Sequence, residues 1–425
     1  MKFYLSLLLI KINFIFSYIK IPFKTFELND INNLYNNYVY INLDIGIPQQ
    51  NNTKIVLKQG KYSFFLYDNN KYINASYNYK LSKTYRKVLD EKLEFTSSTC
   101  FEGLFSQDTF YIENKEIKNL SFVLCSRTKT EEYFFFDGEI GLNLLYEFPE
   151  TSNFVKILKG KEIINNYIYS INYINDKEGY LLIGEYPHNI KRNSNIYDKY
   201  SDFNKNNLYW IHSIVTKNSV HWTISFDKIS YGDGGAYQAQ REARILVETK
   251  YIISSTQYYN SFKEIFGRKC TIILLDEDLE GYKCTKDINK ELTPEIRLFN
   301  RELNTTFVLD YNDLYFETDN YFFFLVTNII NYDPGYWILG KPFLKKYLLL
   351  FDYDNKMIGF YKNSENKKNK SKGINSYSLS LFFNIFLVIV IICLAFAFYQ
   401  YYIKKRRIRA NELEDKFNYT AKNDK

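Results

Sequence analysis

Short runs in which apolar and polar residues alternate occur along most of the chain. Residues 38–45 alternate in this way and lead into Gly46 and Pro48, and residues 222–229 repeat the pattern. Period-two runs bounded by glycine or proline are typical of half-buried β-strands that end in turns. Near the end of the chain, two apolar runs flank the polar residues 354–356, which predicts a hairpin. The pattern therefore predicts an all-β fold.

Two longer apolar segments depart from this pattern. Residues 1–18 combine a basic start with an apolar centre, as a secretory signal peptide does, and a buried N-terminal strand is the alternative. Residues 379–402 carry no charge, and 24 residues of helix extend about 36 Å, enough to cross a bilayer. Residues 403–425 begin with a basic run and are expected to be a cytosolic tail. We therefore expect a single-pass type I membrane protein of the secretory pathway or cell surface, with its ectodomain lumenal or extracellular and a stalk over residues 363–378.

The composition is that of a folded chain longer than one ordinary domain. Its 425 residues are 46% hydrophobic and 19% aromatic, so a substantial core can form. The formal net charge of +7 raises the question of nucleic acid. The densest basic run, residues 404–409, directly follows the expected membrane span and is explained by it. We therefore expect no nucleic-acid partner.

Several stretches together resemble the pepsin family of aspartic proteases. In the clearest one, residues 337–360, an apolar strand closes on Gly340 and a hairpin follows. Weaker matches lie at residues 45–50, 136–142 and 179–184. The resemblance implies a bilobal, all-β, pepsin-like fold, with an N-terminal lobe over residues 35–195 and a C-terminal lobe over residues 205–362.

In that family each lobe carries an Asp-Thr/Ser-Gly loop, and both loops are altered here. Where the first is expected, the chain reads Lys58-Gln59-Gly60, so the glycine is kept and the carboxylate is lost. For the second, a gapless match places Leu246 at the aspartate and Glu248 at the glycine, whereas a two-residue shift places Glu248 at the aspartate. We prefer the first register. Loop-to-glycine separations of 83 residues (58 to 141) and 94 residues (246 to 340) are a weak sign of internal duplication.

Other residues are not expected to restore the catalytic machinery. Residues 233–235 read Asp-Gly-Gly, but their neighbours favour a hairpin turn. Thr96 stands near the place where the resemblance implies a flap tyrosine. Four aspartates remain nearby in the sequence, and each occupies a strand or turn position of the family: Asp44, Asp68, Asp108 and Asp137. A replacement pair of catalytic carboxylates is therefore not expected.

The altered loops change the expected function. Aspartic proteases need two close carboxylates that share one proton, and the ammonium of Lys58 has no acceptor for a proton from water. We therefore expect a non-catalytic pepsin-family protein that binds a peptide or protein in its inter-lobe cleft, with no cofactor. An active aspartic endopeptidase and a structural or adhesive surface protein are the alternatives. Lys58 is expected either to pair with Glu248 across the cleft or to reach solvent.

The cysteines fit an oxidising compartment. Cys393 lies in the expected span, and the other four allow three pairings. We expect pairing within lobes, Cys100 with Cys125 and Cys270 with Cys284, and the second pair also resembles a family feature. The three histidines, His188, His212 and His221, are isolated, so no metal site is expected. Five Asn-x-Ser/Thr triplets are candidate glycan sites: Asn51, Asn74, Asn119, Asn304 and Asn369.

Overall fold

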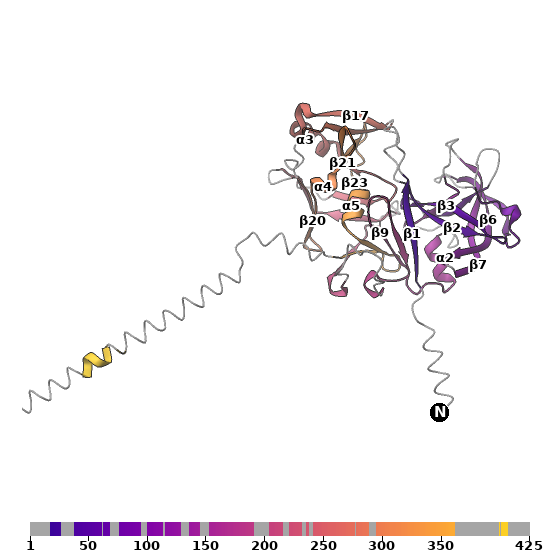
Figure 1. Ribbon diagram of the computed structural model, residues 1–425, viewed down its shortest axis with the longest axis horizontal. Helices are drawn as coiled ribbons and strands as arrows, with labels where there is room; N and C mark the ends of the chain where they lie inside the picture. The colour runs from indigo at the N-terminus through magenta and orange to yellow at the C-terminus, as the bar shows by residue number, and fades with distance from the viewer. Residues whose placement is uncertain are drawn as a thin grey trace, which may run out of the picture. The chain divides into compact units, whose positions relative to one another are not determined.

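The computed structural model is predominantly β-structure, as the alternating pattern predicts (Figure 1). It divides into two compact units, residues 1–362 and residues 363–425. The residues that it describes are 18–26, 38–61, 63–68, 76–94, 100–113, 115–128, 136–144, 153–190, 204–215, 221–231, 235–237, 241–276, 278–288, 295–361, 399 and 401–406.

Within the described part of the first unit, the largest sheet has thirteen strands. In spatial order these are β11 (Leu208–His212), β25 (Met357–Tyr361), β24 (Leu349–Asp352), β9 (Ile168–Tyr173), β10 (Glu178–Ile183), β1 (Ile19–Phe26), β2 (Tyr38–Ile45), β3 (Gln50–Lys58), β8 (Gly138–Gly141), β4 (Phe64–Tyr67), β7 (Lys115–Thr128), β6 (Cys100–Ile112) and β5 (Arg86–Glu94). Strands from the two ends of the unit therefore share one sheet. The predicted hairpin around residues 354–356 is confirmed as the antiparallel pair β24 and β25.

Two smaller sheets build the rest of the second half. One contains β12 (Thr223–Phe226), β15 (Arg241–Ile245), β23 (Trp337–Leu339), β16 (Ile252–Ile253), β22 (Tyr321–Ile329), β18 (Leu279–Thr285), β17 (Cys270–Asp276) and β21 (Tyr315–Glu317). The other contains β14 (Gly235–Tyr237), β13 (Lys228–Tyr231), β19 (Ile296–Asn300) and β20 (Thr305–Leu309). Antiparallel pairing of β13 with β14 agrees with a hairpin at residues 233–235.

Short helices connect these strands. They are α2 (Phe154–Gly160), α3 (Thr256–Phe266), α4 (Tyr311–Leu314) and α5 (Lys341–Lys346), with 3-10 turns at Tyr79–Leu81, Pro187–Asn189, Lys205–Asn207 and Gly267–Lys269. Helix α3 buries Tyr258, Tyr259, Phe262 and Phe266, whose spacing places them on one face. Asp310 caps α4 by accepting the Asn312 N–H at 2.8 Å.

The two halves repeat one arrangement of strands. In the first half β3 runs parallel to β8, β8 antiparallel to β4, and β4 parallel to β7. In the second half β15 runs parallel to β23, β23 antiparallel to β16, and β16 parallel to β22. In Figure 1 the indigo and purple strands of the first half gather around β2, β3, β6 and β7, and the orange α4, α5 and β23 belong to the other half. The internal duplication that the sequence weakly indicates is therefore present in the strand topology.

Strand β1 is an element that the sequence interpretation did not include. It precedes residue 35, where the N-terminal lobe was expected to begin, and it pairs with both β10 and β2. Its alternating sequence buries Ile19, Ile21 and Phe23, each at most 3% exposed. These alternating residues directly follow the apolar signal-like segment, so the two apolar patterns merge in the sequence. Residues 1–17 lie outside the described part of the chain.

Both predicted disulfides are confirmed. Cys100 on β6 is bonded to Cys125 on β7, and Cys270 on β17 to Cys284 on β18. Three of the candidate glycan sites, Asn51, Asn119 and Asn304, are exposed. The other two, at residues 74 and 369, lie outside the described part.

The expected membrane span falls largely on residues that the structure does not describe. Of residues 379–402, the structure describes only 399, 401 and 402, which are helical, as are residues 403–406 after them. Among the described helices, none is long and apolar enough to cross a membrane.

The core is rich in aromatic rings that join the two halves. The Phe351 ring on β24 stacks on Tyr169 with centroids 4.7 Å apart and lies 5.1 Å from Trp222. All three side chains are at most 1% exposed. Since these residues come from β9, β24 and the start of the second half, their packing couples both halves.

Replacing Phe351 by alanine is expected to lower the free energy of unfolding by about 3 to 5 kcal/mol, because it leaves a cavity among buried rings. Chemical denaturation measures the loss. Leu81→Ala is the control, since Leu81 is 60% exposed, and its effect should stay within about 0.5 kcal/mol. Similar losses for the two variants would contradict this account of the core.

Candidate functional site

The two altered loops begin at matching points of the duplicated strands. In the first half, Leu57 and Phe64 both pair with Ile140. In the second half, Ile245 and Ile252 both pair with Leu339. The same number of residues therefore separates the paired strands in each half. Lys58 and Leu246, the first residue of each loop, occupy equivalent positions.

The carboxylate of Glu248 joins the two loops. Its Oε2 accepts the Gln59 N–H at 2.8 Å, and its Oε1 accepts the Gly60 N–H at 2.7 Å. Hydrogen bonds to an ionised acceptor are stronger than neutral ones. A Cβ on Gly60 would lie 2.7 Å from Oε1, so a glycine is needed there for the carboxylate to approach. We call this interaction the Glu248 clamp.

Lys58 does not pair with Glu248. Both oxygens of Glu248 face backbone amides, and Lys58 makes no ion pair with it in the described structure. The Lys58 side chain is partly exposed, and its Nζ lies 5.8 Å from the centre of the Tyr38 ring, a weak cation–π distance. The hypothesis of a Lys58–Glu248 ion pair is therefore wrong. The clamp replaces it because two amide donors are nearer to the carboxylate than the ammonium is.

Behind the clamp, a buried hydrogen-bonded chain crosses from one half to the other. Gln59 is fully buried, and its Nε2 donates to the Tyr169 hydroxyl at 3.1 Å. The Tyr169 hydroxyl donates to the Leu142 carbonyl at 2.8 Å, and the Trp222 Nε1–H donates to the same oxygen at 2.9 Å. Burial raises the pKa of Tyr169 well above its usual value, so the phenol stays a neutral donor.

His221 also contacts the first half. Its Nδ1 lies 3.2 Å from Nδ2 of Asn143, which follows Leu142 directly. Burial, and then the nearby charges of Arg244 and Lys61, lower the pKa of His221 to about 4. His221 therefore stays neutral at all but strongly acidic pH. The sequence interpretation had left this histidine as an isolated residue, because its neighbours come from distant parts of the chain.

Two aspartates of the first half, Asp137 and Asp108, accept hydrogen bonds that hold neighbouring segments together. Asp137 accepts the Lys54 N–H at 2.7 Å and the Ser76 hydroxyl at 2.6 Å. Asp108, fully buried, accepts the hydroxyls of Tyr77 at 2.7 Å and Ser82 at 3.0 Å. These contacts leave neither carboxylate at the loop junction.

The other two aspartates considered above are Asp44 and Asp68. Asp44 accepts the Gln49 side-chain amide at 2.7 Å. Burial is the main cause that raises the pKa of Asp68, against a smaller opposite effect from Lys80. Thr96, near the expected flap position, lies outside the described residues.

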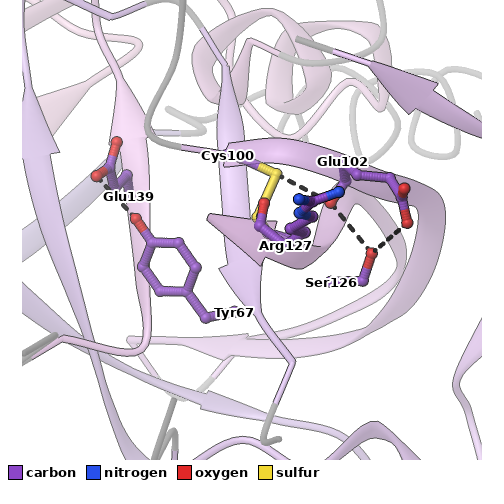
Figure 2. Close-up of a disulfide and its surroundings, with 7 residues drawn as sticks. Tyr67, Cys100, Glu102, Ser126, Arg127 and Glu139 are labelled. Carbon is purple, nitrogen blue, oxygen red and sulfur yellow. Dashed lines mark hydrogen bonds between the residues drawn. A yellow bond between two sulfur atoms is a disulfide. The ribbon is translucent and has the colours of Figure 1, made fainter. Parts of the chain in front are cut away.

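Glu139 is also directed away from the junction, toward the side of the sheet that carries a disulfide. Figure 2 shows its carboxylate accepting the Tyr67 hydroxyl, at 2.8 Å, near the Cys100–Cys125 bond. Tyr67 and both cysteines belong to one small apolar cluster. Glu139 is 4% exposed, and its second oxygen has no hydrogen-bond partner. This carboxylate is therefore no substitute for a catalytic one at the junction.

The family is shown by comparison with known proteins. The family model for eukaryotic aspartyl proteases matches residues 38–363 of the sequence, which make up most of the first unit. The chain therefore belongs to the eukaryotic aspartyl protease family, which confirms the resemblance read from the sequence. No curated protein matches it significantly.

The described junction lacks the pair of carboxylates on which the family's chemistry depends. Lys58 and Leu246 hold the equivalent loop positions, and Glu248 has both oxygens bound to amides. Proton sharing needs a second carboxylate within hydrogen-bond reach. Within the described ranges, no three His, Cys, Asp or Glu side chains gather closely enough to hold a metal ion.

Removing the clamp is expected to destabilise the fold. Glu248→Ala leaves two partly buried amides without their acceptor, and a hydrogen bond to a charged group contributes about 1.5 to 3 kcal/mol. Glu248→Gln keeps one acceptor oxygen and should lose less. Denaturant midpoints of both variants measure this, with Glu242→Ala as the control. Equal stability of Glu248→Ala and the control would show that the clamp contributes nothing.

His221 is expected to make the protein less stable in acid. The unfolded histidine binds a proton below about pH 6.5, whereas the folded one does so only near 4, so stability falls as pH drops between these values. Because the side chain is only partly buried, the loss should be about 1 to 2 kcal/mol. Urea unfolding at pH 7 and pH 4.5 measures it. His221→Gln should reduce the pH dependence, and an unchanged dependence would contradict this assignment.

Proposed function

We propose that this chain is a non-catalytic member of the aspartyl protease family that binds a peptide or protein between its two halves. The observation that carries the proposal is the Glu248 clamp. The carboxylate contributed by the second loop is bound to the Gln59 and Gly60 amides, and a lysine and a leucine begin the two loops. This arrangement supports binding without hydrolysis.

Retention of the scaffold also supports binding. The strands that carry both loops are present and paired, and Gly340 keeps the close packing of the second half, where a Cβ would lie 2.3 Å from the carbonyls of Thr249 and Tyr251. A fold of this class offers strand edges and backbone groups to an extended peptide. The proposed partner is therefore an extended segment of peptide or protein.

We further propose that the protein is anchored in a membrane of the secretory pathway or at the cell surface. The uncharged length of residues 379–402 and the basic run after it support this topology. Two disulfides in the first unit agree with an oxidising compartment. Candidate glycan sites at exposed Asn51, Asn119 and Asn304 are consistent with the same side of the membrane.

The test is cleavage and binding of a diverse peptide library by the purified 425-residue chain between acidic and neutral pH. We expect binding without pepstatin-sensitive cleavage, because no second carboxylate is available to share a proton. Mass spectrometry detects the products, and affinity selection detects binding.

Two variants sharpen this experiment. Lys58→Asp with Leu246→Asp restores both carboxylates, and adding Glu248→Gly also removes the clamp. We expect any gain of cleavage in the triple variant to exceed that in the double variant, because the clamp fills the space beside Gly60. Pepstatin-sensitive cleavage by the unmodified chain would overturn the proposal in favour of an active endopeptidase. Absence of any bound peptide would favour a structural or adhesive protein.

A further inference from the structure

Cations surround the loop junction where catalytic carboxylates stand in the family. Lys58 and Lys61 flank the Gln59-Gly60 pair in the first half. Arg244 lies on β15, two residues before Leu246, so the two side chains share one face of the extended chain. The Leu246 side chain lies 3.7 Å from the position of a Cβ on Gly60, which places this face at the junction. The junction is therefore lined by basic side chains from both halves.

Arg244 is held in place but lacks an anionic partner. Its guanidinium carbon lies 3.6 Å from the centre of the Tyr336 ring, a close cation–π contact that holds the group against the ring. Its Nε is buried and has no hydrogen-bond acceptor, and the described structure gives it no ion pair. Buried donors are nearly always satisfied in folded proteins, so this one needs an explanation. A guanidinium fork matches the geometry of a carboxylate.

Among the described residues, Arg244 makes no ion pair, and a second cation lies near it. The charges that act on neighbouring His221 are those of Arg244 and Lys61, and both lower its pKa. Glu248, the acidic residue of the second loop, has both oxygens on the Gln59 and Gly60 amides. Both charges that act on His221 are therefore positive.

We propose that the junction binds a carboxylate of the peptide ligand, with Arg244 as its anchor, and thereby selects acidic peptides. This inference rests on the proposed function and adds the chemical class of the ligand. The carboxylate comes either from an Asp or Glu side chain or from the C-terminus of the peptide. Both sources offer the two oxygens that a fixed guanidinium binds.

Binding of three pools of fluorescent decapeptides to the full 425-residue chain tests the proposal. The pools are random, with Asp and Glu left out, except for one central position: Glu with an amidated C-terminus, Gln with an amidated C-terminus, and Gln with a free C-terminus. We expect the Glu pool, or the free C-terminal pool, to bind about tenfold or more tightly than the amidated Gln pool, as a hydrogen bond to a charged group implies. Whichever pool is preferred identifies the source of the carboxylate.

Variants assign the preference to Arg244. Arg244→Gln should abolish the preference, so that the three pools bind equally tightly, whereas Arg244→Lys should keep only part of it, because the fork is lost. The control is Arg241→Gln on the same strand, where Arg241 donates to the Gly335 carbonyl instead. It should retain the full preference. Thermal unfolding checks that each variant is folded. If Arg244→Gln does not fold, the partial loss of preference in Arg244→Lys tests the assignment instead.

The outcomes separate this inference from the proposed function. Equal binding of all three pools would overturn the choice of acidic peptides and leave peptide binding standing. A preference that survives in Arg244→Gln would overturn the assignment to Arg244. Absence of binding by every pool would overturn the proposed function, and this inference with it.

Discussion

The carboxylate of Glu248 is the contact on which the centre of this molecule depends. Two backbone amides of the first loop point at one carboxylate of the second, so the loops hold each other without any catalytic group. An isolated carboxylate in a partly buried place is costly, and two N–H donors offset that cost. The same contact requires a glycine at position 60, because any Cβ there would meet the carboxylate oxygen. The glycine kept from the family pattern thus serves a new purpose.

Around this contact the duplicated strands of the family are kept, while a lysine and a leucine stand at the positions of its two aspartates. The buried chain from Gln59 through Tyr169 to the Leu142 carbonyl, which Trp222 also reaches, ties the two halves by neutral hydrogen bonds. Such groups cost little to bury once they are paired. Two cations lie at the junction together with the Glu248 carboxylate: Lys58 is partly exposed, and Arg244 lies against the Tyr336 ring. The proposed loss of hydrolysis and the proposed binding of acidic peptides both rest on these residues.

Much of the architecture could be predicted from the sequence because local pattern and family resemblance agree. The alternating runs predicted the β-structure, and the stretch around Gly340 predicted the family. The expectation of pairing within lobes predicted both disulfides. Strand β1 was missed, although Ile19, Ile21 and Phe23 alternate, because the alternation directly follows the apolar signal-like segment. The partner of Glu248 was also missed, since a sequence suggests opposite side-chain charges more readily than backbone amides.

The sequence by itself determined that the two catalytic aspartates are absent from the expected loops, since that depends only on which residues stand there. It also determined the uncharged segment near the end of the chain and the excess of basic residues. Only the tertiary structure decided that Glu248 binds Gln59 and Gly60, that His221 lies beside Asn143, and that Arg244 faces Tyr336. These contacts join residues up to 189 positions apart. Hydrogen bonds and ring contacts act over a few ångströms, so the folded arrangement of the strands, rather than the order of residues, sets which groups meet.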